Sequence, residues 1–170
     1  MLFRSSQAFR AVTGRWDSSE RPTRKLKRGD TIGPWRVLHP DASDNFVNAD
    51  DAALALSGDF EGTKVLWLSD LGVGGQAKLL EREPSLSADI VVSGLPRQGE
   101  PLRPSLLKAL NPRWIVVTDS DLPASERASK RLRERLGAAG TRVVFTSDVG
   151  AVRSEEHTSE LQSHSDLVCR

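Results

Sequence analysis

Aspartates that follow apolar runs are the residues of this chain best placed to do chemistry. Asp70 ends the run Val-Leu-Trp-Leu-Ser and precedes the glycine-containing segment 71–75. A carboxylate at this point can hold a metal ion, and glycines before a helix can cradle a phosphate. The spacing is not GxGxxG, however, and no Lys-Ser or Lys-Thr pair follows. We therefore interpret Asp70 as part of a turn or as a helix cap.

A second acidic motif, Asp-Ser-Asp-Leu-Pro, occupies positions 119–123 directly after the apolar run Trp114–Thr118. It is similar to the Asp-x-x-Met-Pro phosphoacceptor of response-regulator receiver domains. Such a site also needs acidic partners after an earlier strand and a lysine after a later one. The first predicted strand ends in His39 and a proline, and no predicted strand ends in lysine. We therefore expect Asp121 to cap a helix that has Pro123 in its first turn.

His39 is the only histidine between positions 6 and 152, where cysteine is absent. A zinc site needs three or four ligands from histidine, cysteine or carboxylate side chains. We expect His39 to be a structural, hydrogen-bonded residue. The residue types predict no catalytic residue and no cofactor for the chain as it stands.

A basic segment near the start of the chain is a candidate for nucleic-acid binding. Its cations are Arg21, Arg24, Lys25, Lys27 and Arg28. Such a cluster can contact DNA phosphates without reading base sequence. A solvated loop is the alternative interpretation, which a formal net charge of only +1 favours.

The composition is that of an ordinary globular protein, with 38% hydrophobic and 28% charged residues in a chain of 170. No apolar run reaches the ~20 residues that a membrane-spanning helix needs. The first ten residues carry charge with no apolar stretch behind it, so we expect no targeting signal. A single cysteine excludes an internal disulfide.

The two ends differ from the rest of the sequence. Residues 153–170 read RSEEHTSELQSHSDLVCR, which is polar and without periodicity. Over 153–163 and 166–170 they match the translation of a short-read sequencing adapter, as do residues 1–5. We expect residues 1–5 and 153–170 to be adapter-derived and disordered. We expect residues 6–28 to form a basic linker with a short helix.

Between the ends, the pattern predicts an antiparallel start followed by β-α-β-α-β. The predicted strands are 35–39, 52–57, 64–68, 90–93, 114–118 and 142–145. The predicted helices are 75–82, 104–110 and 124–136, the last with a Glu126–Lys130 pair on its surface. This order of elements predicts helices packed on a mixed sheet, and the loops at Asp70, Gly94 and Asp119 should line one edge of that sheet.

Several motifs in this region occur in a consistent order. They are Gly29-Asp30 followed by Trp35–Pro40, then Asn48–Leu54, Gly62–Asp70, Ala88–Val92, Pro112–Val117 and Gly140–Val152. Together they resemble the C-terminal metallo-β-lactamase-fold domain of ComEC-type DNA-internalisation proteins. Residues 29–152 would then be the second half of an αββα sandwich, an incomplete α/β domain.

The resemblance implies a role in DNA uptake. It places Asp70 at the family's metal-bridging aspartate, but a histidine motif of the family falls on 94–99 and another near 121–124, where this chain has no histidine. The resemblance therefore implies a non-catalytic domain on the outer face of a bacterial inner membrane. Its partners would be the channel part of the same protein and DNA. The alternative is a zinc- or manganese-dependent phosphodiesterase whose remaining ligands lie upstream.

Overall fold

The computed structural model describes residues 24–152, which form one mixed sheet of seven strands in sequence order. Strands β1 to β4 pair antiparallel, and β4 to β7 pair parallel. The strands are β1 (Thr31–Ile32), β2 (Trp35–His39), β3 (Ala55–Phe60), β4 (Thr63–Trp67), β5 (Ile90–Ser93), β6 (Trp114–Val117) and β7 (Arg142–Phe145). The predicted α/β class and mixed sheet are confirmed.

The predicted hairpin of β3 and β4 is confirmed, although its turn is shorter than predicted. Residues 58–60 belong to β3, and only Glu61 and Gly62 form the turn, with φ of 51° and 84°. Two consecutive positive φ angles are typical of the tight turns that match the twist of paired strands. Gly58 lies inside β3, where an added Cβ would come within 2.7 Å of the Phe60 ring.

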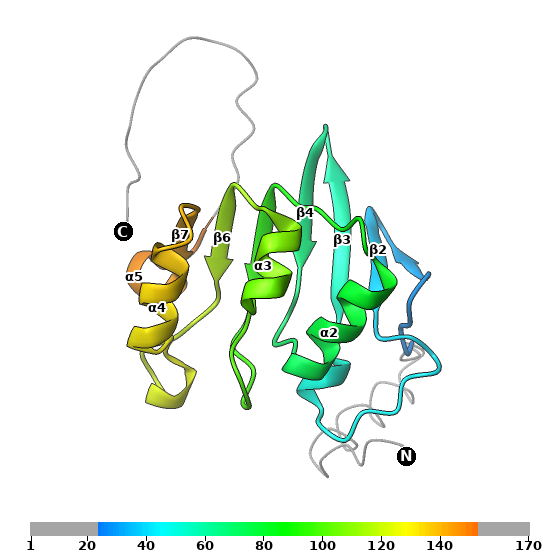
Figure 1. Ribbon diagram of the computed structural model, residues 1–170, viewed down its shortest axis with the longest axis horizontal. Coiled ribbons are helices and arrows are strands. Elements are labelled where there is room, and N and C mark those ends of the chain that lie inside the picture. The colour runs from blue at the N-terminus through cyan, green and yellow to red at the C-terminus, as the bar shows by residue number, and fades with distance from the viewer. Residues whose placement is uncertain (1–23, 153–170) are drawn as a thin grey trace, which may run out of the picture.

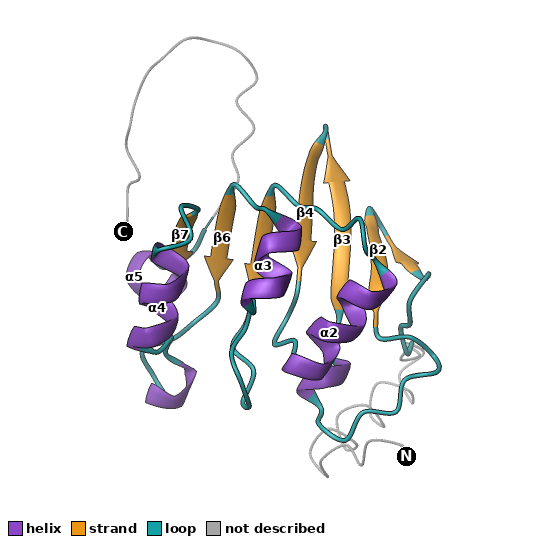
Figure 2. Cartoon of the chain, in the orientation of Figure 1, coloured by secondary structure: helices purple, strands orange, loops and turns teal. Residues whose placement is uncertain are grey.

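Three helices connect the parallel strands and lie together on one face of the sheet (Figures 1 and 2). They are α2 (Val73–Arg82), α3 (Pro104–Leu110) and α4 (Lys130–Gly137). Because crossovers between parallel strands are right-handed and the strands follow in order, each crossover returns on the same face. No helix within residues 24–152 is long and apolar enough to cross a membrane.

The core lies between these helices and the sheet. Alternate residues of the central strands, among them Leu66, Val91 and Ile115, are at most 1% exposed. They pack against Leu79, Leu106, Leu132 and Leu136 of the helices in one cluster. The period of two in the strands therefore meets the apolar stripe of each helix.

The opposite face of the sheet is also apolar, and we call it the open face. Besides Thr63 and Arg142, its side chains are those of Ile32, Trp35, Val37, Leu56, Phe60, Val65, Trp67, Ile90, Val92, Trp114, Val116 and Val144. None of them belongs to the core cluster formed by residues 24–152. Trp67, Ile32 and Phe60 are 47%, 42% and 38% exposed, Val37 is buried, and the other apolar side chains of the face are half-buried. One face of the sheet is thus covered by helices and the other presents apolar side chains outward.

The region predicted as one helix over 124–136 is divided. A 3-10 turn, η2 (Ala124–Glu126), is followed by extended backbone at Arg127, and α4 begins only after Ser129. The Ser129 hydroxyl accepts a hydrogen bond from the Leu132 amide and caps the helix. The predicted Glu126–Lys130 pair is wrong for this reason, and Lys130 instead lies 3.8 Å from Glu134.

Two short helices complete the fold: η1 (Asp50–Ala52), which precedes β3, and α5 (Thr146–Val149), which follows β7. The termini at 1–23 and 153–170 lie outside the described residues, as does the short helix predicted near the N-terminus.

Candidate functional site

The loops after the parallel strands meet at one edge of the sheet, as predicted. The amide of Gly94 donates to the carbonyl of Ser69, and the amide of Thr118 donates to that of Ser93 at 2.9 Å. Gly94 has no room for a side chain, because an added Cβ would lie 2.9 Å from the Ser69 oxygen. This edge therefore brings together the segments around Asp70, Gly94 and Asp119.

Asp70 itself is an exposed residue in the turn between β4 and α2. Its carboxylate accepts a hydrogen bond from the neighbouring Ser69 hydroxyl at 3.2 Å. Ser69 has a positive φ of 41°, which turns the chain sharply at this point. The turn interpretation of Asp70 is confirmed, and the cap position of α2 belongs to Gly72.

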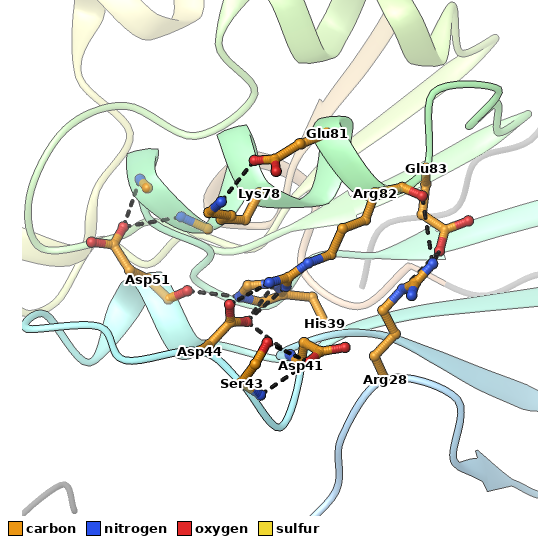
Figure 3. A network of polar contacts seen from close by, with 12 residues as sticks. Arg28, His39, Asp41, Ser43, Asp44, Asp51, Lys78, Glu81, Arg82 and Glu83 are labelled. Atoms are coloured by element: carbon orange, nitrogen blue, oxygen red, sulfur yellow. Dashed lines mark hydrogen bonds and ion pairs between the residues drawn. The ribbon is translucent and has the colours of Figure 1, made fainter. Parts of the chain in front are cut away.

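The glycine-containing segment after Asp70 is filled by the carboxylate of Asp51 (Figure 3). Asp51 Oδ1 accepts hydrogen bonds from the amides of Gly74 and Gly75 at 2.7 and 3.3 Å. A Cβ on Gly72 would lie 2.5 Å from the same oxygen. The first turn of α2 thus binds an internal anion, because unpaired amides and the helix dipole favour negative charge there. A phosphate would have to displace Asp51.

The neighbouring residue Asp50 also contacts the loops at this edge of the sheet. Its carbonyl accepts from the amide of Gly72 at 2.9 Å, and its carboxylate accepts from the amide of Arg97 at 2.7 Å. We refer to Asp50 and Asp51 as the aspartate clamp. The clamp ties the loops after β4 and β5 to each other.

His39 is fully buried behind the clamp. Its Nε2 lies 2.7 Å from the carbonyl oxygen of Asp51, which makes Nε2 the protonated nitrogen of the neutral ring. Within the described residues Nδ1 has no hydrogen-bond partner, and it lies 3.9 Å from Asp44 Oδ2. The prediction of a structural, hydrogen-bonded histidine is confirmed. Desolvation by burial lowers the pKa of His39 below its ordinary 6.5, against the carbonyl of Asp51 and the charge of Asp44.

Asp44 pairs with Arg82 at the end of α2 (Figure 3). Arg82 Nη1 donates to Asp44 Oδ2 at 2.8 Å, and Nη2 donates to Oδ1, so the pair is bidentate. These hydrogen bonds from Arg82 are the main cause that lowers the pKa of the Asp44 carboxyl and raises that of the guanidinium. The negative charge closest to His39 Nδ1 is therefore already neutralised by an arginine.

The basic segment is divided between anchored and free cations. Arg28 donates to Glu83 Oε1 from Nε and Nη2 at 3.0 and 2.7 Å, and Arg24 lies 3.2 Å from Asp30. Lys25 and Lys27 are exposed. Arg21 lies outside the described residues. The structure thus assigns Arg28 a structural contact and leaves the two lysines as the cations best placed to meet a phosphate.

The acidic motif at 119–123 is structural, but the predicted cap at Asp121 is wrong. Asp119, not Asp121, makes the contacts. Its carboxylate accepts from the amides of Ala128 and Ser147 at 3.1 and 2.9 Å and from Arg133 Nη2 at 3.0 Å. These hydrogen bonds keep the pKa of the Asp119 carboxyl low although its burial acts to raise it. Asp121 is a surface residue 3.2 Å from Arg127.

The sequence reasoning missed the clamp and Asp44. The run Asn48-Ala-Asp-Asp-Ala looked like an acidic loop, and no local rule connects it to glycines more than twenty positions away. Among residues 24–152, no three histidine, cysteine or acidic side chains gather as a metal-ligand group. Comparison with protein-family models, curated proteins and solved structures finds no match to this chain.

The burial of His39 predicts a dependence of stability on pH. The unfolded chain binds this proton near pH 6.5, whereas the folded protein resists it to a lower pH. The contribution of neutral His39 to stability is therefore fully present above about pH 6.5 and is lost as the pH falls below it, by up to about 1.4 kcal/mol per pH unit. Urea unfolding of the wild type and of His39→Gln at several pH values measures this slope. The variant should lose the His39 contribution, and an unchanged slope would contradict the assignment.

The clamp predicts that Asp51→Ala destabilises the protein by about 1–2 kcal/mol, since the first turn of α2 loses its anion. Asp70→Ala is the matched control, because it removes an exposed carboxylate one turn away and should change stability by less than about 0.5 kcal/mol. Urea denaturation at pH 7.5 measures both. Equal effects of the two substitutions would show that the Asp51 carboxylate does not stabilise the first turn of α2.

Proposed function

We propose that this chain is part of a non-catalytic metallo-β-lactamase-like domain of a ComEC-type protein for DNA uptake. In that setting the domain lies on the outer face of a bacterial inner membrane, beside the channel part of the same protein. Its role is to receive or pass DNA and not to cleave it.

The open face is the observation that carries the proposal. Contiguous exposed apolar surface beyond a few hundred Å² is uncommon on monomeric soluble proteins and marks a surface that packs on something else. Here the outward side chains of a seven-stranded sheet are apolar from β1 to β7 except for Thr63 and Arg142. An αββα sandwich places a second sheet on such a face, so the arrangement supports a half-domain.

The loop after β5 supports a role without catalysis. The family's histidine motif falls on residues 94–99, and here Leu95 packs against the core while Pro96 is buried. The next residue, Arg97, gives its amide to the clamp at Asp50. The residues at these positions therefore serve packing and loop closure.

In this proposal the exposed lysines of the basic segment, Lys25 and Lys27, contact the DNA. Cations that neutralise phosphates act by releasing counterions, so binding of this kind is insensitive to base sequence and weakens with salt. Lys25 and Lys27 meet the requirement, because they are exposed and close to each other in the chain.

Fluorescence anisotropy with a labelled single-stranded oligonucleotide tests this role. Lys25→Ala with Lys27→Ala should weaken binding several-fold at 50 mM salt and reduce the slope of log K against log salt by about 1.4. Lys108→Ala with Lys130→Ala removes the same charge from exposed positions on α3 and α4 and is the control. Equal losses in both double variants would point to net charge alone, and binding unaffected by either would place the contact elsewhere.

A metal-dependent phosphodiesterase is the second candidate, and the position of Asp70 is the observation that favours it. Its carboxylate is exposed at the carboxyl end of a parallel strand, where α/β proteins commonly bind ligands. Among residues 24–152 the carboxylate has one neutral contact, from Ser69, and so is available to a metal held by residues from an upstream half. Zinc or manganese would then activate water for attack on a phosphodiester.

Isothermal titration calorimetry with zinc tests whether this chain can hold a metal ion by itself. The full chain carrying His157→Ala, His164→Ala and Cys169→Ala should bind no stoichiometric zinc, because a lone carboxylate holds a divalent ion weakly. Manganese should behave in the same way, and neither metal should produce phosphodiesterase activity. One tightly bound metal per chain, lost in Asp70→Ala, would restore the enzyme candidate.

A further inference from the structure

The open face is almost free of charge. Among its strand residues the one charged side chain is that of Arg142 on β7, whose guanidinium lies 5.0 Å from the ring centroid of Trp114. The aspartate and lysine of the hairpin, Asp59 and Lys64, belong to the opposite face by the alternation of β3 and β4. Two such faces can therefore approach each other without burying an acid or opposing rows of like charge.

The face is large enough to hold a pair of chains together. Strands lie ~4.8 Å apart and rise ~3.3 Å per residue, so these strands of two to six residues together present on the order of 500 Å² in flat projection. Two interdigitated faces would bury somewhat more than about 1,000 Å² in total, which reaches the size of specific protein interfaces. Stacked sheets in proteins pack in this way, about 10 Å apart.

Side-chain size varies across the face in a way that selects one arrangement. Trp35 packs edge-on against Phe60 and Trp67, with ring centroids 5.2 and 6.1 Å apart, which makes the β2–β4 side large. The β5–β7 side carries the smaller Ile90, Val92, Val116 and Val144, with Trp114 as its one aromatic residue. A two-fold axis along the strands near β4 places the large side of one copy over the small side of the other. Large groups over small groups fill the space between sheets best.

We infer that this chain forms a symmetric dimer in which two copies pack their open faces together, β1 of one copy over β7 of the other. The pairing goes beyond the proposed role in DNA uptake and does not rest on it. It follows from the apolar character, area and near-absence of charge of the face. A second copy takes the place that an upstream sheet would occupy in a longer protein.

Light scattering after size exclusion tests the pairing on the full chain. The wild type should have twice the chain mass, and Trp67→Glu should shift it to the monomer mass by placing a charge at the centre of the face. Val47→Glu is the matched control: it adds the same charge to an apolar residue that is 95% exposed and outside every strand, and it should remain a dimer. A monomeric wild type, open-ended aggregates, or a Trp67→Glu dimer at the same concentration would overturn the inference.

A second measurement leaves the open face unaltered, so it does not depend on the folding of Trp67→Glu. Spin labels on Thr31→Cys, with Cys169→Ser, report the distance between the two β1 strands of a dimer. The proposed axis separates them by about 30 Å, the width of the sheet, whereas an axis across the strands brings them to about 10 Å. Circular dichroism of Trp67→Glu confirms its fold, and a short label distance would overturn the arrangement.

Discussion

The contacts of Asp51 with His39, Gly74 and Gly75 are the interactions on which the described fold depends most. The carbonyl of Asp51 accepts from the buried ring of His39 on β2, and its carboxylate accepts from the amides of Gly74 and Gly75 at the start of α2. One residue thus joins the antiparallel half of the sheet to the first helix of the parallel half. The glycines are required because any side chain at Gly75 would meet the backbone of Asp51.

The other constraint is that a sheet has two faces and the helices cover one. Right-handed crossovers between β4, β5, β6 and β7 put α2, α3 and α4 on the same face, so the connection order alone leaves the second face without a helix. The residues on that face are nevertheless apolar, with three tryptophans among them. A sheet whose solvent side was meant for water would alternate apolar with polar residues, as antiparallel sheets commonly do. The proposed half-domain and the proposed dimer are two ways to satisfy the same unpartnered surface.

Much of the fold could be predicted from the sequence, because the strongest signals were local. The strands 35–39, 90–93 and 142–145 and the helix that starts at Pro104 have the predicted bounds, since apolar runs between prolines, glycines and asparagine define them. The helix predicted over 124–136 was wrong in its first half, because a distant carboxylate competes with helix formation. Asp119 takes the amide of Ala128, and Ser129 then supplies the real cap.

The candidate site was harder to predict than the fold for the same reason. The role of His39 was inferred correctly from the scarcity of other ligands, but its partners come from η1 and the loop before it, which carry no periodic signal. The basic segment looked uniform in the sequence, whereas the structure distinguishes Arg28 from Lys25 and Lys27 through Glu83. Only the three-dimensional arrangement shows which charges are already neutralised.

Helix α2 connects these observations, since it is held at both ends by residues from the antiparallel half. Asp51 binds its first turn, and Asp44 binds Arg82 in its last turn. Glu83, directly after the helix, holds Arg28, whose Nη2 also reaches the carbonyl of Arg82 at 3.5 Å. Arg28 therefore anchors the segment that carries Lys25 and Lys27 to the C-terminal end of α2, and the clamp fixes the N-terminal end of the same helix. In the proposed role, a DNA strand that engaged these lysines would meet a segment held by the sheet and α2 together, which gives a phosphate contact a defined position on a molecule whose formal net charge is only +1.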